Sequence, residues 1–175
     1  MSEPTRVVDF HVHALHAEVF KQSTNKTVFT GFGANPVNEP RPGAKALLER
    51  MFKPESIMED MTARGIDVAV LTSSTVLQGT SWADAEHDLA LCRLCNEQLA
   101  AWAKEHPKRI VGSMVLPLQD VAKSVSELIA LVKARPGEFN YGSSGNGGGA
   151  HLAGESLRHM AKLDMTHIPY RGAAP

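Results

Sequence analysis

Strand-like and helix-like segments alternate along the first 120 residues of this chain, and that alternation constrains the fold more than any other feature. Apolar runs of strand length are separated by segments in which apolar residues recur at helical spacing. Such alternation is typical of β-α-β units, whose parallel strands lie in one α/β sheet. Strands are expected at residues 6–13, 66–72 and 109–116, with helices at 44–51, 54–61 and 83–105.

Length and composition exclude several classes of partner. The chain has 175 residues, enough for one ordinary domain or two small ones. The formal net charge is −1 and the basic residues are scattered, so no nucleic-acid or anionic-membrane partner is expected. No apolar stretch approaches the roughly 18 residues of a membrane span, and residues 1–6 do not resemble a secretion signal. We therefore expect a cytoplasmic protein.

The two cysteines lie three residues apart in a helical segment. Cys92 and Cys95 fit either a redox or zinc motif, or two small residues on one helix face. The second interpretation is favoured, because there is no other Cys pair and small apolar residues of this kind are usually buried.

A pair of histidines follows the first expected strand. With a period of two, Asp9, His11 and His13 share the polar face. The apolar face is expected to pack against helices (Val8, Phe10 and Val12). Two imidazoles on one strand face reach a single ion such as zinc, iron, nickel or copper, and Asp9 is placed to orient a ligand. The alternative is a pair of ordinary surface or core histidines.

Residues 14–43 are expected to be irregular, because glycine and proline punctuate them. A loop this long following the first strand is either a lid or substrate wall, or a tolerated surface loop.

Taken in order, several segments resemble a known family. These are Asp9-Phe10-His11-Val12-His13, residues 61–67, Asn96, residues 106–112 and residues 116–120. Over residues 6–120 the chain resembles the amidohydrolase-related family that includes aminocarboxymuconate-semialdehyde decarboxylase. The resemblance implies a metal-dependent (β/α)₈ barrel that hydrolyses or non-oxidatively decarboxylates a small acidic or aromatic substrate. It implies His11 and His13 as ligands of a divalent metal, with zinc expected, and Asp9 beside them.

The family's remaining ligands, a His and an Asp, come from later strands. This sequence provides about three of the eight β/α units that a closed barrel needs. The expectation is therefore a partial (β/α) barrel over residues 1–120, with an incomplete metal site and no assigned catalytic residue. An open sheet of three strands leaves a face and an edge exposed, which favours self-association through that edge.

The sequence changes character near residues 119–122. A helix is expected at 122–135, a short strand at 139–141, a glycine-rich loop at 142–149, a helix at 150–163 and a strand and turn over 166–172. A glycine-rich loop leading into a helix presents backbone N–H groups to an anion. A flexible linker is the alternative.

This second part resembles the substrate-binding receptors of tripartite tricarboxylate transporters. The matching segments are residues 123–125, 127–131, 134–137, 141–148, 151–155 and 166–175. The resemblance implies that residues 121–175 are a fragment of a periplasmic-binding-protein-like α/β lobe that binds a small carboxylate. It implies contacts from Ser143, Ser144, Gly145 and Asn146.

Three hypotheses for function remain open at this stage. The first is a metal-dependent amidohydrolase-type enzyme that lacks a complete active site. The second is a carboxylate-binding module carried on a foreign N-terminal part. The third is a non-functional fusion of two unrelated parts.

Overall fold

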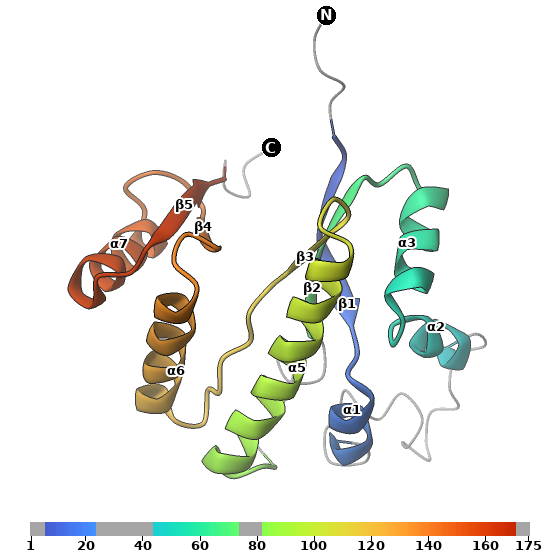
Figure 1. Cartoon of the computed structure of the whole chain (residues 1–175), viewed down its shortest axis with the longest axis horizontal. Coiled ribbons are helices and arrows are strands. Elements are labelled where there is room, and N and C mark those ends of the chain that lie inside the picture. Colours follow the sequence, from blue (N-terminus) through green and yellow to red (C-terminus); the bar gives the residue numbers. More distant parts are fainter. Residues whose placement is uncertain (1–5, 24–43, 74–81, 171–175) are drawn as a thin grey trace, which may run out of the picture. The chain divides into compact units, whose positions relative to one another are not determined.

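The structure, a computed structural model, describes residues 6–23, 44–73 and 82–170. The chain divides into two compact units, Met1–Asp120 and Val121–Pro175 (Figure 1). Each unit contains helices and parallel strands, so the α/β class predicted from the sequence is confirmed.

The first unit contains a parallel sheet in the order β1-β2-β3. Its strands are β1 (Val8–Ala14), β2 (Val68–Ser73) and β3 (Ile110–Gly112). Its described helices are α1 (Ala17–Ser23), α2 (Ala44–Arg50), α3 (Pro54–Ala63) and α5 (Ala85–Glu105). The predicted order of strands and helices over 44–112 is therefore confirmed. Gly65, with a φ of +69°, ends the turn after α3, as glycine does after a helix.

Strand β1 does not alternate simply. Its pairing with β2 shifts register between Asp9 and Val12, so that two residues of β1 lie opposite Val70. This irregularity corrects the expected period of two. Val12 packs on the helix-covered side of the sheet, whereas Phe10 is 54% exposed. The predicted packing of the whole apolar row against helices is wrong, because the irregularity interrupts the alternation between Val8 and Val12.

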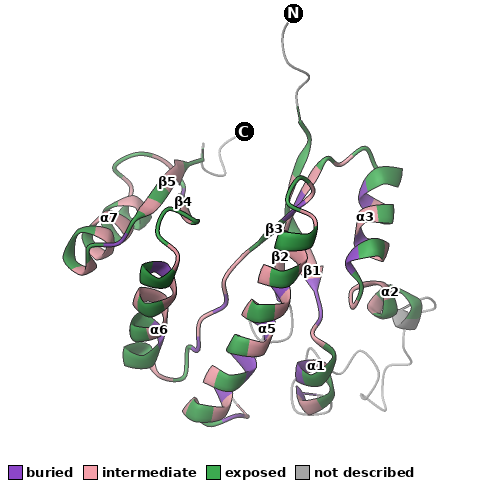
Figure 2. Cartoon of the chain, viewed as in Figure 1, coloured by how far each residue is buried: buried purple, intermediate pink, exposed green. Residues whose placement is uncertain are grey.

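One face of the sheet is covered by α3 and α5. The apolar cluster there joins the strands to these two helices (Ala14, Ile57, Met61, Ala69, Leu71, Leu99 and Ile110). Figure 2 shows buried residues along one side of α5 and exposed residues along the other. The near-continuous apolar sequence of β2 is explained by this burial, since Ala69 and Leu71 are fully buried.

A second apolar cluster corrects the expectation that residues 14–43 are wholly irregular. Residues 17–23 form α1, and its Val19 belongs to the same buried cluster as Leu91 of α5. Residues 24–43 lie outside the described residues. Cys92 and Cys95 are buried in the same cluster, which confirms their interpretation as small residues on a helix face. Burial raises the pKa of the Cys95 thiol to about 11, so the thiolate is disfavoured.

Strand β3 is shorter than predicted. It ends at Gly112 because the chain beyond it bonds to a helix side chain. The Asn96 amide of α5 donates from Nδ2 to the Val115 carbonyl oxygen at 2.9 Å, and its Oδ1 accepts from the Val115 N–H at 2.8 Å. A side chain thus takes the place of a neighbouring strand at Val115.

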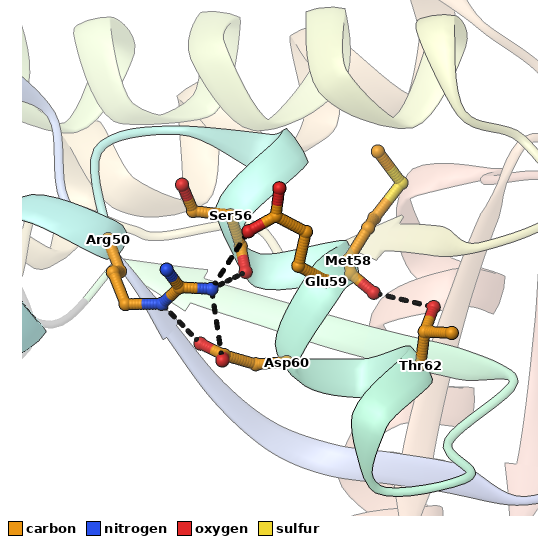
Figure 3. Close-up of polar contacts among 6 residues, drawn as sticks. All are labelled: Arg50, Ser56, Met58, Glu59, Asp60 and Thr62. Carbon is orange, nitrogen blue, oxygen red and sulfur yellow. Dashed lines mark hydrogen bonds and ion pairs between the residues drawn. The ribbon is translucent and has the colours of Figure 1, made fainter.

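A guanidinium group joins α2 to α3 (Figure 3). Arg50 donates from Nε and Nη2 to the two carboxylate oxygens of Asp60, at 2.9 and 3.0 Å. The same Nη2 donates to the carbonyl oxygen of Ser56 and to Glu59. These hydrogen bonds from Arg50 lower the pKa of Asp60. Because Arg50 contacts both carboxylate oxygens of Asp60, the interaction orients the short helix α2 relative to α3.

The second unit pairs two parallel strands with two helices. It contains α6 (Val121–Ala134), β4 (Phe139–Ser143), α7 (Gly149–Ala161) and β5 (Met165–Pro169), and β4 pairs with β5. All four predicted elements are therefore confirmed within one or two residues. Helix α7 has no buried residue, so its attachment to the strands depends on the aromatic and polar contacts described below.

Among the helices that the structure describes, none combines the length and the apolar character needed to cross a membrane.

Candidate functional sites

The two histidines predicted as metal ligands lie together at the carboxyl end of β1. The Nε2 atoms of His11 and His13 are 3.0 Å apart, and the rings meet edge to face with centroids 4.6 Å apart. His11, which lies within the register shift, and His13, which follows it, thus bring their Nε2 atoms close together. The ends of parallel strands are where ligand sites of α/β folds are usually built.

His13 carries a buried ring nitrogen without a hydrogen-bond partner among the described residues, Nδ1. Burial, and then the neighbouring His11, lower the pKa of His13. Both effects favour the neutral imidazole, which has a lone pair to offer an ion. His11 is exposed, so the pair can be reached from solvent.

Asp9 lies next to this pair and contacts its backbone. Oδ1 of Asp9 accepts a hydrogen bond from the His11 N–H at 3.0 Å. The carboxylate therefore fixes the chain at the register shift, and this hydrogen bond is to the main chain of His11. Its predicted role of orienting an imidazole stays a prediction.

A third ligand is not assembled by the described residues. Nowhere in residues 6–23, 44–73 and 82–170 do three His, Cys, Asp or Glu side chains gather in a way that could hold an ion. His16 follows closely in the sequence, but its Nδ1 accepts the Val19 N–H at 3.4 Å at the start of α1. The described site is a two-nitrogen pair.

The second candidate site is the glycine-rich loop between β4 and α7. Ser143 ends β4 and is 7% exposed. Its hydroxyl contacts the carbonyl oxygen of Gly145 at 3.0 Å and Nε2 of His167 at 2.7 Å, and it accepts the Gly145 N–H at 3.3 Å. Gly145 and Gly147 have φ values of 137° and 80°, which favour glycine. The loop is thus tied to β5 through Ser143.

The four residues predicted as carboxylate contacts take different positions. The Ser143 hydroxyl is occupied by its contacts with Gly145 and His167, whereas Ser144 and Asn146 are exposed. Gly145 is half-buried. Their role in binding a carboxylate stays a prediction.

Three aromatic rings stack beside this loop. The ring of His167 lies between those of His151 and Tyr141, with centroid distances of 4.1 and 4.9 Å. Nδ1 of His151 accepts the Gly147 N–H at 2.9 Å, which joins the stack to the loop. Neither His151 nor His167 was predicted as a site residue from the sequence. The signal that finds them is the parallel register, which places Tyr141 opposite His167.

A charged pair holds the outer end of the stack. The Tyr141 hydroxyl donates to Glu155 at 2.6 Å, and Arg158 donates to the same carboxylate at 2.7 and 3.1 Å. Hydrogen bonds from Arg158 and then Tyr141 lower the pKa of Glu155 to about 2. Desolvation, and then the bond to Glu155, raise the pKa of Tyr141 to about 12.

These two pKa shifts predict a stability maximum for the second unit between the ordinary pKa values of the two groups. The stability that Glu155 contributes is fully present above pH 4.5, the ordinary pKa of the group, and is lost as the pH falls towards 2. The stability that Tyr141 contributes is fully present below pH 10, the ordinary pKa of the group, and is lost as the pH rises towards 12. In a Tyr170→Phe variant, Tyr141 is the remaining tyrosine, and its absorbance titration should give the raised pKa directly.

Glu155→Gln is the control for this prediction. It should lower the pKa of Tyr141 and remove the Glu155 contribution to the loss of stability in acid. A titration of Tyr141 near 10 in the Tyr170→Phe chain would contradict the described contact.

The C-terminal part of the chain matches a receptor family. The model of the tripartite tricarboxylate transporter family receptor matches residues 108–175, which includes β3 and the whole second unit. A UPF0065 protein of Bordetella pertussis is 47% identical over 53 residues, which are 30% of this chain and 16% of that protein. The predicted resemblance to these receptors is confirmed.

The resemblance to amidohydrolase-type decarboxylases is also confirmed. The 2-amino-3-carboxymuconate-6-semialdehyde decarboxylase of Dictyostelium discoideum is 31% identical over 77 residues, 44% of this chain and 21% of that enzyme. The solved dihydroxybenzoic acid decarboxylase of Polaromonas sp. JS666 superposes with a TM-score of 0.62 at 17% identity, and the match covers 95% of this chain and 50% of that one. At that identity the likeness shows the fold alone.

This chain spans about half the length of the solved decarboxylase, and its matches cover about a fifth or less of the curated relatives. The Polaromonas enzyme was solved with bound manganese. The expectation of zinc therefore gains no support from this relative.

Proposed function

We propose that this chain binds a divalent cation through His11 and His13, and that the cation serves the non-oxidative decarboxylation of a small aromatic or acidic carboxylate. The observation that supports the proposal is the convergence of the two Nε2 atoms at the carboxyl end of β1. Decarboxylation is favoured over hydrolysis because both amidohydrolase-type relatives described above are named as decarboxylases.

The residues present fit such an ion in part. Imidazole nitrogens bind metals at about 2.0–2.1 Å, so two nitrogens on one ion lie no more than about 4.2 Å apart. The observed separation is 3.0 Å. Without an ion, two neutral rings can form only one hydrogen bond between these Nε2 atoms, with one nitrogen as donor and the other as acceptor. An ion would instead use both lone pairs, and the lowered pKa of His13 favours the neutral form that provides one.

The chain's own residues have separable tasks in this proposal. His11 and His13 would hold the ion, and Asp9 fixes the backbone at His11 by accepting the His11 N–H. When bound, a divalent ion polarises carboxylate and phenolate oxygens of a substrate as a Lewis acid. The open polar end of β1, where His11 is exposed, is where the substrate would approach.

The test is the release of carbon dioxide from dihydroxybenzoic acid, or from 2-amino-3-carboxymuconate-6-semialdehyde, with manganese added in steps. Release should depend on the metal and should be lost in His11→Ala and His13→Ala. His159→Ala is the matched control, since it removes an exposed imidazole from α7 and should leave release unchanged. Release that persists in both β1 variants would overturn the assigned role of the pair.

A second candidate function belongs to the second unit. Its glycine-rich loop, with the match of residues 108–175 to the transporter-receptor family, supports the binding of a small carboxylate by Ser143, Ser144, Gly145 and Asn146. Citrate should then raise the unfolding temperature seen by tyrosine signals, because Tyr141 and Tyr170 both lie in this unit. Sulfate at equal ionic strength is the control. An equal shift with both anions would rule out a specific carboxylate site.

A further inference from the structure

A histidine of α7 holds the glycine-rich loop that connects β4 to α7. Nδ1 of His151 accepts a hydrogen bond from the Gly147 N–H at 2.9 Å. A ring nitrogen can accept such a bond only while it carries no proton, so the proton of neutral His151 is on Nε2. Gly147 has a φ of 80°, and glycine populates other conformations as readily. The hydrogen bond from Gly147 therefore helps to hold one conformation of the loop.

The ring of His151 lies face to face with a second imidazole. His151 and His167 stack with their centroids 4.1 Å apart and an interplanar angle of 13°. Two charged rings at this separation repel each other, so the uptake of one proton opposes the uptake of the next. The two titrations therefore belong to the pair of rings together.

A proton has different effects on the contacts of the two rings. Nε2 of His167 lies 2.7 Å from the Ser143 hydroxyl, which can donate to a neutral nitrogen or accept from a protonated one. That contact therefore survives protonation. The Gly147 N–H can only donate, so it has no hydrogen bond to make with a protonated Nδ1 of His151. Acid thus breaks the attachment of the loop to α7 and leaves its attachment to β5.

We infer that the attachment of the glycine-rich loop to α7 is pH-sensitive, and that protonation of His151 releases Gly147. The inference goes beyond the metal and carboxylate binding proposed above, since it requires no ligand. The attachment is present while His151 is neutral, and it is lost as the pH falls through the titration of this ring. Imidazole is the side chain whose charge ordinarily changes between about pH 5 and 8.

The charged and titratable groups around this ring come from α7, β4 and β5. On α7, the Glu155 carboxylate attracts the charged form of the ring, and it stays ionised in this range because its pKa is lowered to about 2. Arg158 donates to the same carboxylate and offsets part of that attraction. Strand β5 contributes His167, and β4 contributes Tyr141, which stays neutral because its pKa is raised to about 12. The loop itself has no titratable side chain.

Nuclear magnetic resonance of the whole chain tests the inference as the pH is lowered from about 8 to about 5. The amide shift of Gly147 should change with the same midpoint as the ring protons of His151. The protection of this amide from hydrogen exchange, relative to its intrinsic rate, should fall by about 2–10-fold, as the loss of one hydrogen bond implies. In His151→Asn, which provides an acceptor oxygen that does not titrate, the Gly147 amide should stay constant. His159→Ala removes an exposed imidazole from the same helix and should behave like the parent chain.

The parent chain alone provides the first decisive comparison. A Gly147 amide shift that stays constant while the His151 ring titrates would overturn the inference. A His151→Asn chain whose Gly147 amide titrates as it does in the parent chain would also overturn it, because the titrating group would then lie elsewhere.

Discussion

Replacing Asn96 with alanine is expected to lower the free energy of unfolding of the Met1–Asp120 unit by about 2–4 kcal/mol. The Asn96 side chain satisfies both peptide groups of Val115, at 2.8 and 2.9 Å. Val115 is 1% exposed, so water cannot readily replace the lost partners. Each buried backbone group left without a partner costs about 1–3 kcal/mol. Two such groups are affected by a single substitution.

Urea unfolding followed by tryptophan fluorescence measures this effect. Trp82 and Trp102 both lie in the first unit, so the signal reports that unit alone. Gln98→Ala on the same helix is the matched control, since Gln98 donates a single hydrogen bond, to the Leu15 carbonyl oxygen at 3.1 Å. Its effect should be clearly smaller. Equal effects of the two substitutions would show that Asn96 does not substitute for a strand at Val115.

Replacing Gly154 with alanine should destabilise the second unit by about 1–3 kcal/mol, as overpacking commonly does. A Cβ at Gly154 would overlap the ring of Tyr141, at 2.7 Å from Cζ. The ring has little room to retreat, because His167 stacks on it at 4.9 Å. At an unconstrained helix position the same substitution stabilises by about 0.8–1 kcal/mol. Whether Gly154→Ala lowers or raises the stability therefore shows whether Gly154 packs against the ring of Tyr141.

Gly149→Ala provides the control within the same helix. A Cβ at Gly149 meets nothing within 4 Å, so alanine there should be neutral or stabilising. Unfolding of the second unit is followed by the near-ultraviolet signals of Tyr141 and Tyr170, and the tryptophan transition should stay unchanged. A Gly154→Ala chain that is as stable as the Gly149→Ala chain would contradict the packing of α7 on β4.

The order of elements could be read from the sequence because it depends on local patterns. The apolar run of β2 and the helical spacing of apolar residues in α5 both predict which residues are buried, and the structure buries them. The shortening of β3 could not be predicted, because it depends on Asn96, which meets Val115 only after α5 packs against the sheet. Helix α1 was missed for the same reason, since Val19 is buried by α5.

Some residues of the candidate sites could be predicted from local sequence patterns, and others could not. His11 and His13 were predicted from spacing, and the structure brings their Nε2 atoms together. The simple alternation that suggested them is nevertheless interrupted at the register shift, which strand periodicity cannot reveal. His151 and His167 were not predicted, because they become neighbours only when β5 pairs with β4 and α7 folds back on the strands.

Binding of manganese to the purified chain tests the central claim most directly. Free manganese(II) has a strong paramagnetic resonance signal that weakens on binding, so a titration gives affinity and stoichiometry without any assay of activity. We expect saturable binding that His13→Ala weakens by at least about 100-fold, since the loss of even an outer-shell partner costs about 10–100-fold. His159→Ala should bind as the parent chain does. Equal binding by the parent and His13→Ala chains would show that the histidine pair of β1 does not hold the ion.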